Sequence, residues 1–151
     1  MRFAIVVSKF NAEVTDGLLA GAQAYLREEG VEDTAVDVFR APGAFEIPLL
    51  AQSLAKRGHA GQKYSGVICL GAVVKGDTAH FEFISLGAAV GIMQAGLATE
   101  TPITFGILTT YNDEQAISRS RREGPEAPHN KGREAAAACL ETARTLADLT
   151  Y

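Results

Sequence analysis

The chain has 151 residues, of which 47% are apolar and 21% charged, a composition typical of a folded globular protein. This length suits a single domain, and we expect residues 1–151 to form it. A formal net charge of −4 argues against nucleic acid or an anionic membrane as the main partner. The first apolar run is too short for a signal sequence, and both cysteines fall in apolar segments. We therefore expect a cytoplasmic, metal-free protein with buried thiols.

Four short apolar runs alternate with helical patterns along the chain. The runs have the β-branched, nearly continuous apolar character of strands buried on both faces of a sheet: residues 3–7, 35–39, 67–70 and 103–108. Apolar residues at helical spacing predict helices at residues 14–26, 47–54, 81–98, 114–120 and 131–149. Gly30 and Gly58 end the first two, and a Pro-rich break at 124–128 divides the last two. This order predicts an α/β three-layer sandwich, in which helices cover both faces of a four-stranded parallel sheet.

The helix predicted at residues 81–98 is unusually apolar. Residues 83–99 carry no charge, and Gly87, Gly91 and Ala95 follow one another at four-residue spacing. A helix that is apolar all round is either buried all round or spans a membrane, and this one is too short and too diluted by small residues for a bilayer. One face covers the sheet, so we expect the small residues to contact a second copy of the chain. An ordinary helix–sheet contact is the alternative.

The segment GAVVKGDTAH at residues 71–80 leads from the third strand through a Gly-flanked turn into a helix N-terminus, which favours an anion. The spacing from Gly71 to Gly76 and Thr78 nearly matches a Walker A loop. Asp77 replaces the lysine of that motif and would repel a triphosphate, so a nucleotide triphosphatase is excluded. A single phosphate held by backbone N–H groups and the Thr78 hydroxyl is one interpretation. A tight turn with no ligand is the other.

Three side chains near predicted strand ends have the chemistry of a small-molecule site. His80 opens a helix beside the phosphate loop, which favours a general acid or base over a packing histidine. Glu46, in APGAFE at residues 41–46, either marks a helix start or accepts hydrogen bonds from substrate hydroxyls. Phe10, in SKFN at residues 8–11, either covers the core or stacks on a planar heterocycle, with Asn11 beside it. The carboxyl ends of parallel strands share one edge, so we expect one crevice.

A basic segment interrupts the otherwise acidic chain. Its cations are Arg119, Arg121, Arg122, Lys131 and Arg133. Such a run is usually a solvated surface. The alternative is that two or three of these cations reach a phosphate held by a neighbouring subunit.

Six motifs taken together resemble the 6,7-dimethyl-8-ribityllumazine synthase family, and the resemblance covers essentially the whole chain. The motifs are SKFN at 8–11, APGAFE at 41–46, GAVVKGDTAH at 71–80, FGILTT at 105–110, EQAI at 114–117 and HNKG at 129–132. The resemblance implies a flavodoxin-like fold and the penultimate step of riboflavin synthesis. In that step 5-amino-6-(D-ribitylamino)uracil condenses with 3,4-dihydroxy-2-butanone 4-phosphate, releasing phosphate and water. It implies a transferase that needs no cofactor.

The resemblance also assigns roles to residues of this chain. By it, Phe10 stacks on the pyrimidine ring with Asn11 nearby, and His80 shuttles protons. The ring and ribityl chain are held by Gly43, Ala44, Phe45, Glu46, Ala72, Val73 and Val74. The phosphate lies at Gly76, Asp77 and Thr78. Phe105, Arg119 and Lys131 come from the adjacent subunit, and the two cations reach the phosphate.

Two departures from the family pattern bear on assembly. Residues 118–129 form a longer connection than in members that build sixty-subunit shells, and few residues precede the first strand. Both traits resemble those of free pentamers, so we expect a homopentamer with active sites between subunits. The longer connection leaves the roles of Arg121, Arg122 and His129 open. Riboflavin synthase is a candidate partner by the same resemblance.

Other classes of protein fit parts of this pattern. A flavin- or lumazine-binding module, or a shell-forming homologue without activity, would keep the scaffold. His80 beside the phosphate loop speaks against both, because a pure binder has no use for that pairing. An archaeal-type riboflavin synthase is the enzyme alternative, but we would not expect its loop to read GDTAH.

Overall fold

The computed structural model describes residues 1–149 and contains the strands and long helices that the sequence predicts. In chain order these elements are β1 (Phe3–Ser8), α1 (Ala12–Glu28), β2 (Val36–Ala41), α2 (Ile47–Arg57), β3 (Gly66–Val74), α3 (His80–Thr99), β4 (Ile103–Thr110), α4 (Asp113–Ser118) and α5 (Lys131–Asp148). Short 3₁₀ turns lie in the connections: η1 (Asp33–Ala35), η2 (Ala44–Glu46) and η3 (Ala127–His129).

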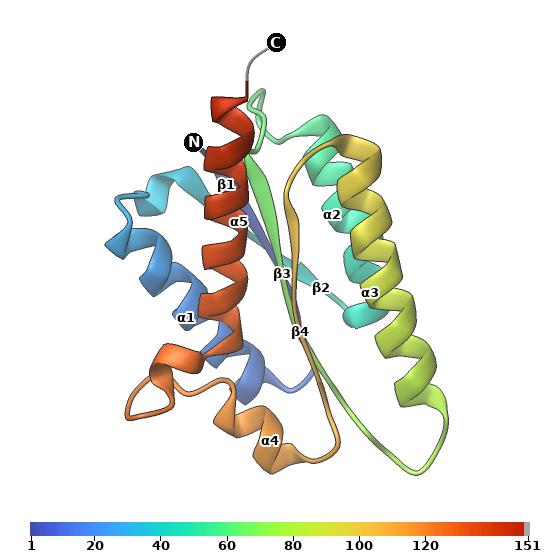
Figure 1. Cartoon of the computed structure of the whole chain (residues 1–151). Helices are drawn as coiled ribbons and strands as arrows, with labels where there is room; N and C mark the ends of the chain where they lie inside the picture. The colour runs from blue at the N-terminus through green and yellow to red at the C-terminus, as the bar shows by residue number, and fades with distance from the viewer. Residues whose placement is uncertain (150–151) are drawn as a thin grey trace.

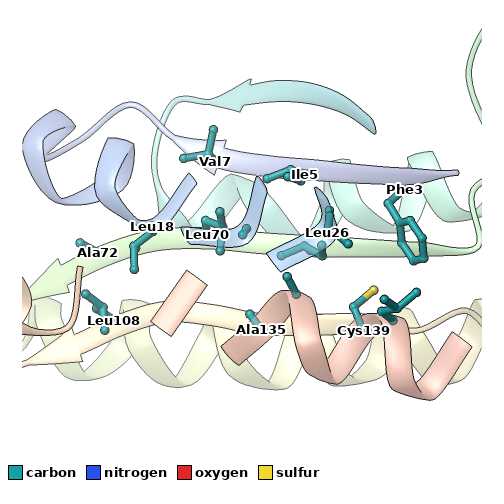
Figure 2. Packing of buried hydrophobic residues seen from close by; sticks show 14 of the residues in the cluster. Phe3, Ile5, Val7, Leu18, Leu26, Leu70, Ala72, Leu108, Ala135 and Cys139 are labelled. Carbon is teal, nitrogen blue, oxygen red and sulfur yellow. The ribbon is translucent and has the colours of Figure 1, made fainter. Parts of the chain in front are cut away.

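The strands form one parallel four-stranded sheet in the order β2-β1-β3-β4. Helices α1 and α5 cover one face, and α2 and α3 cover the other (Figure 1). Figure 2 shows the core on the α1–α5 side, where Leu18 and Leu26 of α1 and Ala135 of α5 pack over Ile5 and Leu70 of the sheet. All six residues of β1 are buried, which is why its first five residues are all apolar rather than alternating with polar ones. The predicted three-layer α/β sandwich is confirmed.

The third strand is longer than predicted, and Gly71 lies inside it rather than in a turn. β3 continues to Val74 because residues 71–74 pair with residues 107–110 of β4. The pairing between β1 and β3 ends earlier, at Val7 and Leu70. The loop before α3 is therefore only residues 75–79. The prediction of a turn that begins at Gly71 was wrong.

The two glycines of this series on α3 lie against η2 and α2 of the same chain, which corrects the prediction that they contact a second copy. A Cβ on Gly91 would lie 2.9 Å from the Cβ of Pro48, at the start of α2. A Cβ on Gly87 would lie 3.5 Å from the Phe45 ring, and Ala95 is buried. Glycine at position 91 thus allows α2 and α3 to approach closely within one subunit.

A separate line of large apolar side chains on α3 is exposed. We call it the α3 stripe: Phe83, Leu86, Val90, Met93 and Leu97. Alternating steps of three and four residues place these side chains along one side of the helix. Among residues 1–149, α3 is the one helix long and apolar enough to cross a membrane, although one such helix is weak evidence for crossing. Contiguous apolar surface confined to one side of a helix fits contact with another protein surface.

Polar side chains join the amino ends of the strands, opposite their carboxyl ends. The Tyr64 hydroxyl donates a hydrogen bond to Oδ2 of Asp37 at 2.6 Å, and Arg2 donates to the same oxygen at 2.7 Å. Burial and the hydrogen bond to Asp37 raise the pKa of Tyr64 to about 12. The hydrogen bond from Tyr64 is the main cause that holds the pKa of Asp37 below its usual value, and the hydrogen bond and charge of Arg2 lower it further.

The Tyr64 hydroxyl predicts a loss of stability at alkaline pH. Its pKa is about 12 in the folded chain and about 10 in an unfolded one, so the folded chain binds this proton more tightly. The stabilisation that the protonated Tyr64 hydroxyl gives the folded chain is complete below pH 10 and disappears as the pH rises towards 12. Tyr64→Phe should lower the free energy of unfolding by about 1–2 kcal/mol near neutral pH, and should make its alkaline decline shallower. Urea denaturation at one fixed protein concentration measures both quantities, and equal alkaline slopes would contradict the assignment.

Candidate active site

The connections after β1, β2 and β3 meet at the carboxyl ends of the strands, at the lower end of the molecule in Figure 1, and enclose a cavity of about 330 Å³. This volume is in the range of small-molecule sites. The lining residues are Phe10, Pro42, Gly43, Ala44, Ala72, Val73, Val74, Gly76, Thr78, His80, Phe81 and Ile84. Most residues that the sequence assigns to one crevice are therefore brought together by the fold.

One wall of the cavity is the end of β3 that extends beyond β1. Residues 71–74 pair with β4 on one side, but the β1 pairing has already ended at Leu70. Backbone N–H and C=O groups of residues 72–74 that point to the β1 side therefore have no neighbouring strand. Such groups seek hydrogen-bond partners, and a planar ligand with alternating donors and acceptors satisfies them as a strand would. This edge was not predictable from the apolar run alone, because it depends on where the two pairings end.

Two large aromatic side chains lie exposed in the connections around the cavity. The Phe10 ring lines it and is 63% exposed, which is unusual for a phenylalanine without a partner surface. Phe45 is equally exposed, and a Cβ on Gly87 of α3 would lie beside its ring. Phe45 is not among the lining residues. An exposed aromatic face at a cavity can stack on a planar heterocycle.

His80 is the first residue of α3 and lines the cavity together with Thr78 and Gly76. The His80 backbone N–H reaches the Thr78 hydroxyl only at 3.4 Å, a long hydrogen bond. The free N–H groups at the start of α3 and this weakly held hydroxyl form an environment that favours an anion. Asp77 is exposed on the same loop but does not line the cavity.

Two further predicted residues lie outside the cavity lining. Glu46 is exposed at the start of α2, and its carboxylate lies beside Gly43, which does line the cavity. Asn11 begins α1 with φ 56°, and it lines a different hollow together with Asp113 of α4. The fold therefore keeps Glu46 near the cavity but places Asn11 in a different hollow.

Three lining residues were not predicted as site residues: Pro42, Phe81 and Ile84. Pro42 lies within the APGAFE motif. Phe81 and Ile84 lie three residues apart in the first turns of α3, on the side that His80 also occupies. Ile84 lies four residues after His80, and this helical spacing was a signal in the sequence.

A second hollow of about 560 Å³ runs along the open edge of β4 and contains the remaining predicted residues, Phe105, Arg119 and Lys131. His129, Glu126 and Glu134 line it as well. It shares no lining residue with the His80 cavity. Within one chain the two groups of predicted residues lie in two separate hollows.

These features define an α/β protein with a cavity of small-molecule size at the carboxyl ends of a parallel sheet and a separate hollow on the sheet edge, lined by both cations and carboxylates.

Comparison with known proteins identifies the family. The family model of 6,7-dimethyl-8-ribityllumazine synthase matches residues 1–147. The chain is 61% identical to 6,7-dimethyl-8-ribityllumazine synthase 1 of Caulobacter vibrioides, over 96% of this chain and 90% of that protein. The enzymes of the same name from Nitratidesulfovibrio vulgaris and Salinibacter ruber are each 48% identical, over 99% and 98% of this chain and 90% of each relative. The chain belongs to the 6,7-dimethyl-8-ribityllumazine synthase family and is a transferase of riboflavin biosynthesis.

Proposed function

We propose that this chain condenses 5-amino-6-(D-ribitylamino)uracil with 3,4-dihydroxy-2-butanone 4-phosphate, releasing 6,7-dimethyl-8-ribityllumazine, phosphate and water. The observation that carries this proposal is one cavity that combines an exposed aromatic ring, an unpaired strand edge and a histidine at a helix N-terminus. Each of the three matches one part of the reaction.

The pyrimidine ring is bound by stacking and by backbone hydrogen bonds. Phe10 offers an exposed aromatic face at the cavity. The free edge of residues 72–74 pairs with the donors and acceptors of the ring. Ala44 adds apolar contact, and Phe45 and Glu46 on η2 serve the ribityl chain, whose hydroxyls donate to the Glu46 carboxylate.

His80 moves protons during the condensation. The 5-amino group attacks the ketone and water leaves, forming a C=N bond between the two substrates. A base then removes the proton from the hydroxyl-bearing carbon next to the C=N bond, and phosphate leaves with the electron pair of its C–O bond, which gives an enol. The enol takes up a proton at its terminal carbon and becomes a new carbonyl. The ribitylamino nitrogen closes the second ring on this carbonyl, and water leaves again. These steps need proton transfer and orientation but no nucleophile from the protein.

The phosphate is held at the boundary between two subunits. Thr78 and the first N–H groups of α3 face it from one subunit, with Asp77 on the same loop. Arg119 and Lys131 face it from the β4 hollow of the neighbour. The separation of the two hollows in one chain supports this arrangement, because neither hollow contains both His80 and the two cations.

The assembly is a homopentamer in which the α3 stripes of adjacent subunits meet. The stripe is exposed in one chain although its members are large and apolar. Burying it against copies of itself also brings the His80 end of α3 near a neighbouring subunit. The protein acts in the cytoplasm, where its two buried cysteines stay reduced; burial raises the pKa of the Cys139 thiol to about 12.

Incubating the purified protein with the two substrates tests the proposal. Lumazine absorbance should rise with one phosphate released per lumazine formed. His80→Ala should slow this turnover by about 10²-fold and leave the assembly intact. His59→Ala, at the opposite end of the sheet beside Phe39, is the matched control and should keep wild-type turnover.

Two outcomes would contradict the proposal. Binding of flavin or lumazine without turnover would identify a non-catalytic binding protein. Unchanged turnover in His80→Ala would remove this histidine from the mechanism.

A further inference from the structure

The two cations of the β4 hollow come from opposite ends of the segment that joins α4 to α5. Arg119 is the C-cap residue of α4, and Lys131 is the first residue of α5. The Lys131 N–H donates a hydrogen bond to the Arg119 carbonyl at 2.8 Å. The backbone therefore closes the intervening segment into a loop and brings these two residues together, and both of their side chains line the β4 hollow.

The closed loop is held to the body of the protein by one buried side chain, Asn130. Its exposed fraction is 1%, and both ends of its amide are bonded. Nδ2 donates to the Gly17 carbonyl of α1 at 3.0 Å and to the Arg121 carbonyl of the loop at 3.1 Å. Oδ1 accepts from the Arg133 N–H of α5 at 3.0 Å. One amide thus connects α1, the loop and α5.

Glycines in α1 and α5 leave the space that this connection needs. A Cβ on Gly21 would overlap the Asn130 amide. A Cβ on Gly17 would overlap the Ser120 carbonyl, and one on Gly132 would overlap the Leu18 carbonyl. The residue after Arg119 and the residues on both sides of Lys131 therefore lie in direct contact with α1, which fixes the ends of the loop relative to this helix.

The two bonds from Nδ2 have no role in capping the helix. An N-cap residue needs only an acceptor for the first N–H groups, and serine or aspartate supplies one as well as asparagine. The Oδ1 bond to Arg133 is such a cap. The two donated bonds hold backbone carbonyls of α1 and of the loop, and only an amide at this position both accepts and donates twice.

We infer that Asn130 is a positioning residue for phosphate binding: it fixes Arg119 and Lys131 in the geometry that receives the phosphate of a substrate bound in the neighbouring subunit. This inference rests on the proposed function for the identity of the phosphorylated substrate. Asn130 itself is buried behind the loop and touches no substrate. It acts through the two cations, because a small displacement of groups that bind an anion together weakens binding strongly.

Two variants from different elements test the inference. Asn130→Ser keeps an N-cap oxygen but is too short to hold the two carbonyls. Gly21→Ala keeps the asparagine at position 130, but the new methyl group on α1 pushes its amide out of position. Alanine is a better helix former than glycine, so α1 itself should not be weakened. Arg144→Gln is the control, because it removes a different contact between α1 and α5, the ion pair with Glu29 at 2.9 Å, far from the loop.

Both variants should raise the KM for the butanone phosphate on the order of tenfold, and should leave the KM for the ribitylaminouracil within about twofold of wild type. Both should also weaken binding of inorganic phosphate, measured by calorimetry without turnover. Arg144→Gln should change neither quantity. Light scattering checks that the compared variants have the same assembly as the wild-type protein. If Asn130→Ser fails to fold, the KM values and phosphate binding of Gly21→Ala alone test the inference.

Equal rises of both KM values, or unchanged phosphate binding in Gly21→Ala, would overturn the inference and leave Asn130 as a helix cap only. Absence of turnover in the wild-type protein would count against the proposed function instead. In that case the calorimetric comparison of phosphate binding still decides the role of Asn130.

Discussion

Leu86→Asp is expected to convert the assembled protein into monomers and to abolish turnover. Leu86 lies within the α3 stripe, which the assembly proposal places against the same stripe of adjacent subunits. Burying an aspartate there would require either a protonated carboxyl or an unpaired charge, and an unpaired buried charge costs several kcal/mol per subunit. Each monomer would keep its His80 cavity but lose the cations of its neighbour.

The same substitution should cost the single subunit little. The Leu86 side chain is 66% exposed, and surface substitutions usually change the free energy of unfolding by less than about 0.5 kcal/mol. Leu146→Asp on α5 is the matched control, because Leu146 is also an exposed leucine but lies in the other helical layer. Analytical ultracentrifugation and the lumazine assay should report monomers without activity for Leu86→Asp and active assemblies for Leu146→Asp. An assembled, active Leu86→Asp protein would show that the α3 stripe is not the subunit contact.

Arg119→Ala is expected to lower kcat/KM by about 10²- to 10³-fold, an effect of about 3–4 kcal/mol. The guanidinium lies in the β4 hollow, where one of its N–H groups donates to the Gln115 carbonyl at 3.1 Å. The remaining donors are available to the phosphate, both when it binds and as it leaves with the electron pair. Removing them weakens ground-state binding and removes stabilisation of the developing charge.

Arg119→Lys should recover only part of this loss, because a lysine cannot bind phosphate oxygens through two parallel bonds. Arg122→Ala is the control from the same basic segment. Arg122 lines the hollow between α1 and the loop rather than the β4 hollow. Steady-state kinetics with each substrate varied separately measures these effects, and equal losses in Arg119→Ala and Arg122→Ala would contradict a specific role for Arg119.

The apolar runs and the Gly and Pro signals were sufficient to predict the order of strands and helices, because the two central strands, β1 and β3, are buried on both faces and therefore have almost continuously apolar sequences. The end of β3 was not predictable. Gly71 has the composition of a turn, but pairing with β4 extends the strand to Val74, and that pairing depends on residues far along the chain. The unpaired edge that forms a wall of the cavity follows from this extension.

The neighbours that each side of α3 contacts could not be predicted from the sequence either. The small residues of α3 indicated a close contact, which is correct, but the two glycines lie against η2 and α2 of the same subunit rather than a second copy. Which side of an apolar helix faces which neighbour depends on packing, because an uncharged sequence offers no polar side to orient it. The hypothesis of an interface now rests on the α3 stripe.

Motif chemistry located most of the His80 cavity, since loops after parallel strands share one edge of the sheet. The same logic suggested that Asn11 lies beside Phe10, but Asn11 begins α1 in a left-handed conformation and lines another hollow. Asn130 belongs to the HNKG motif, but the motif predicted no role for it. Its three hydrogen bonds to α1, the loop and α5 depend on tertiary contacts that no local pattern encodes.

Mixing two inactive variants tests the central claim, an active site completed by a neighbouring subunit. His80→Ala and Arg119→Ala, co-expressed with different tags and purified as mixed assemblies, should recover about a quarter of wild-type turnover. At equal ratio, that is the fraction of subunit boundaries that pair an intact His80 with an intact Arg119. Mixed assemblies of wild type with the His80→Ala/Arg119→Ala double variant should also reach about a quarter, against about half if each site lay within one subunit. Turnover no higher than that of the separate variants would contradict the shared site.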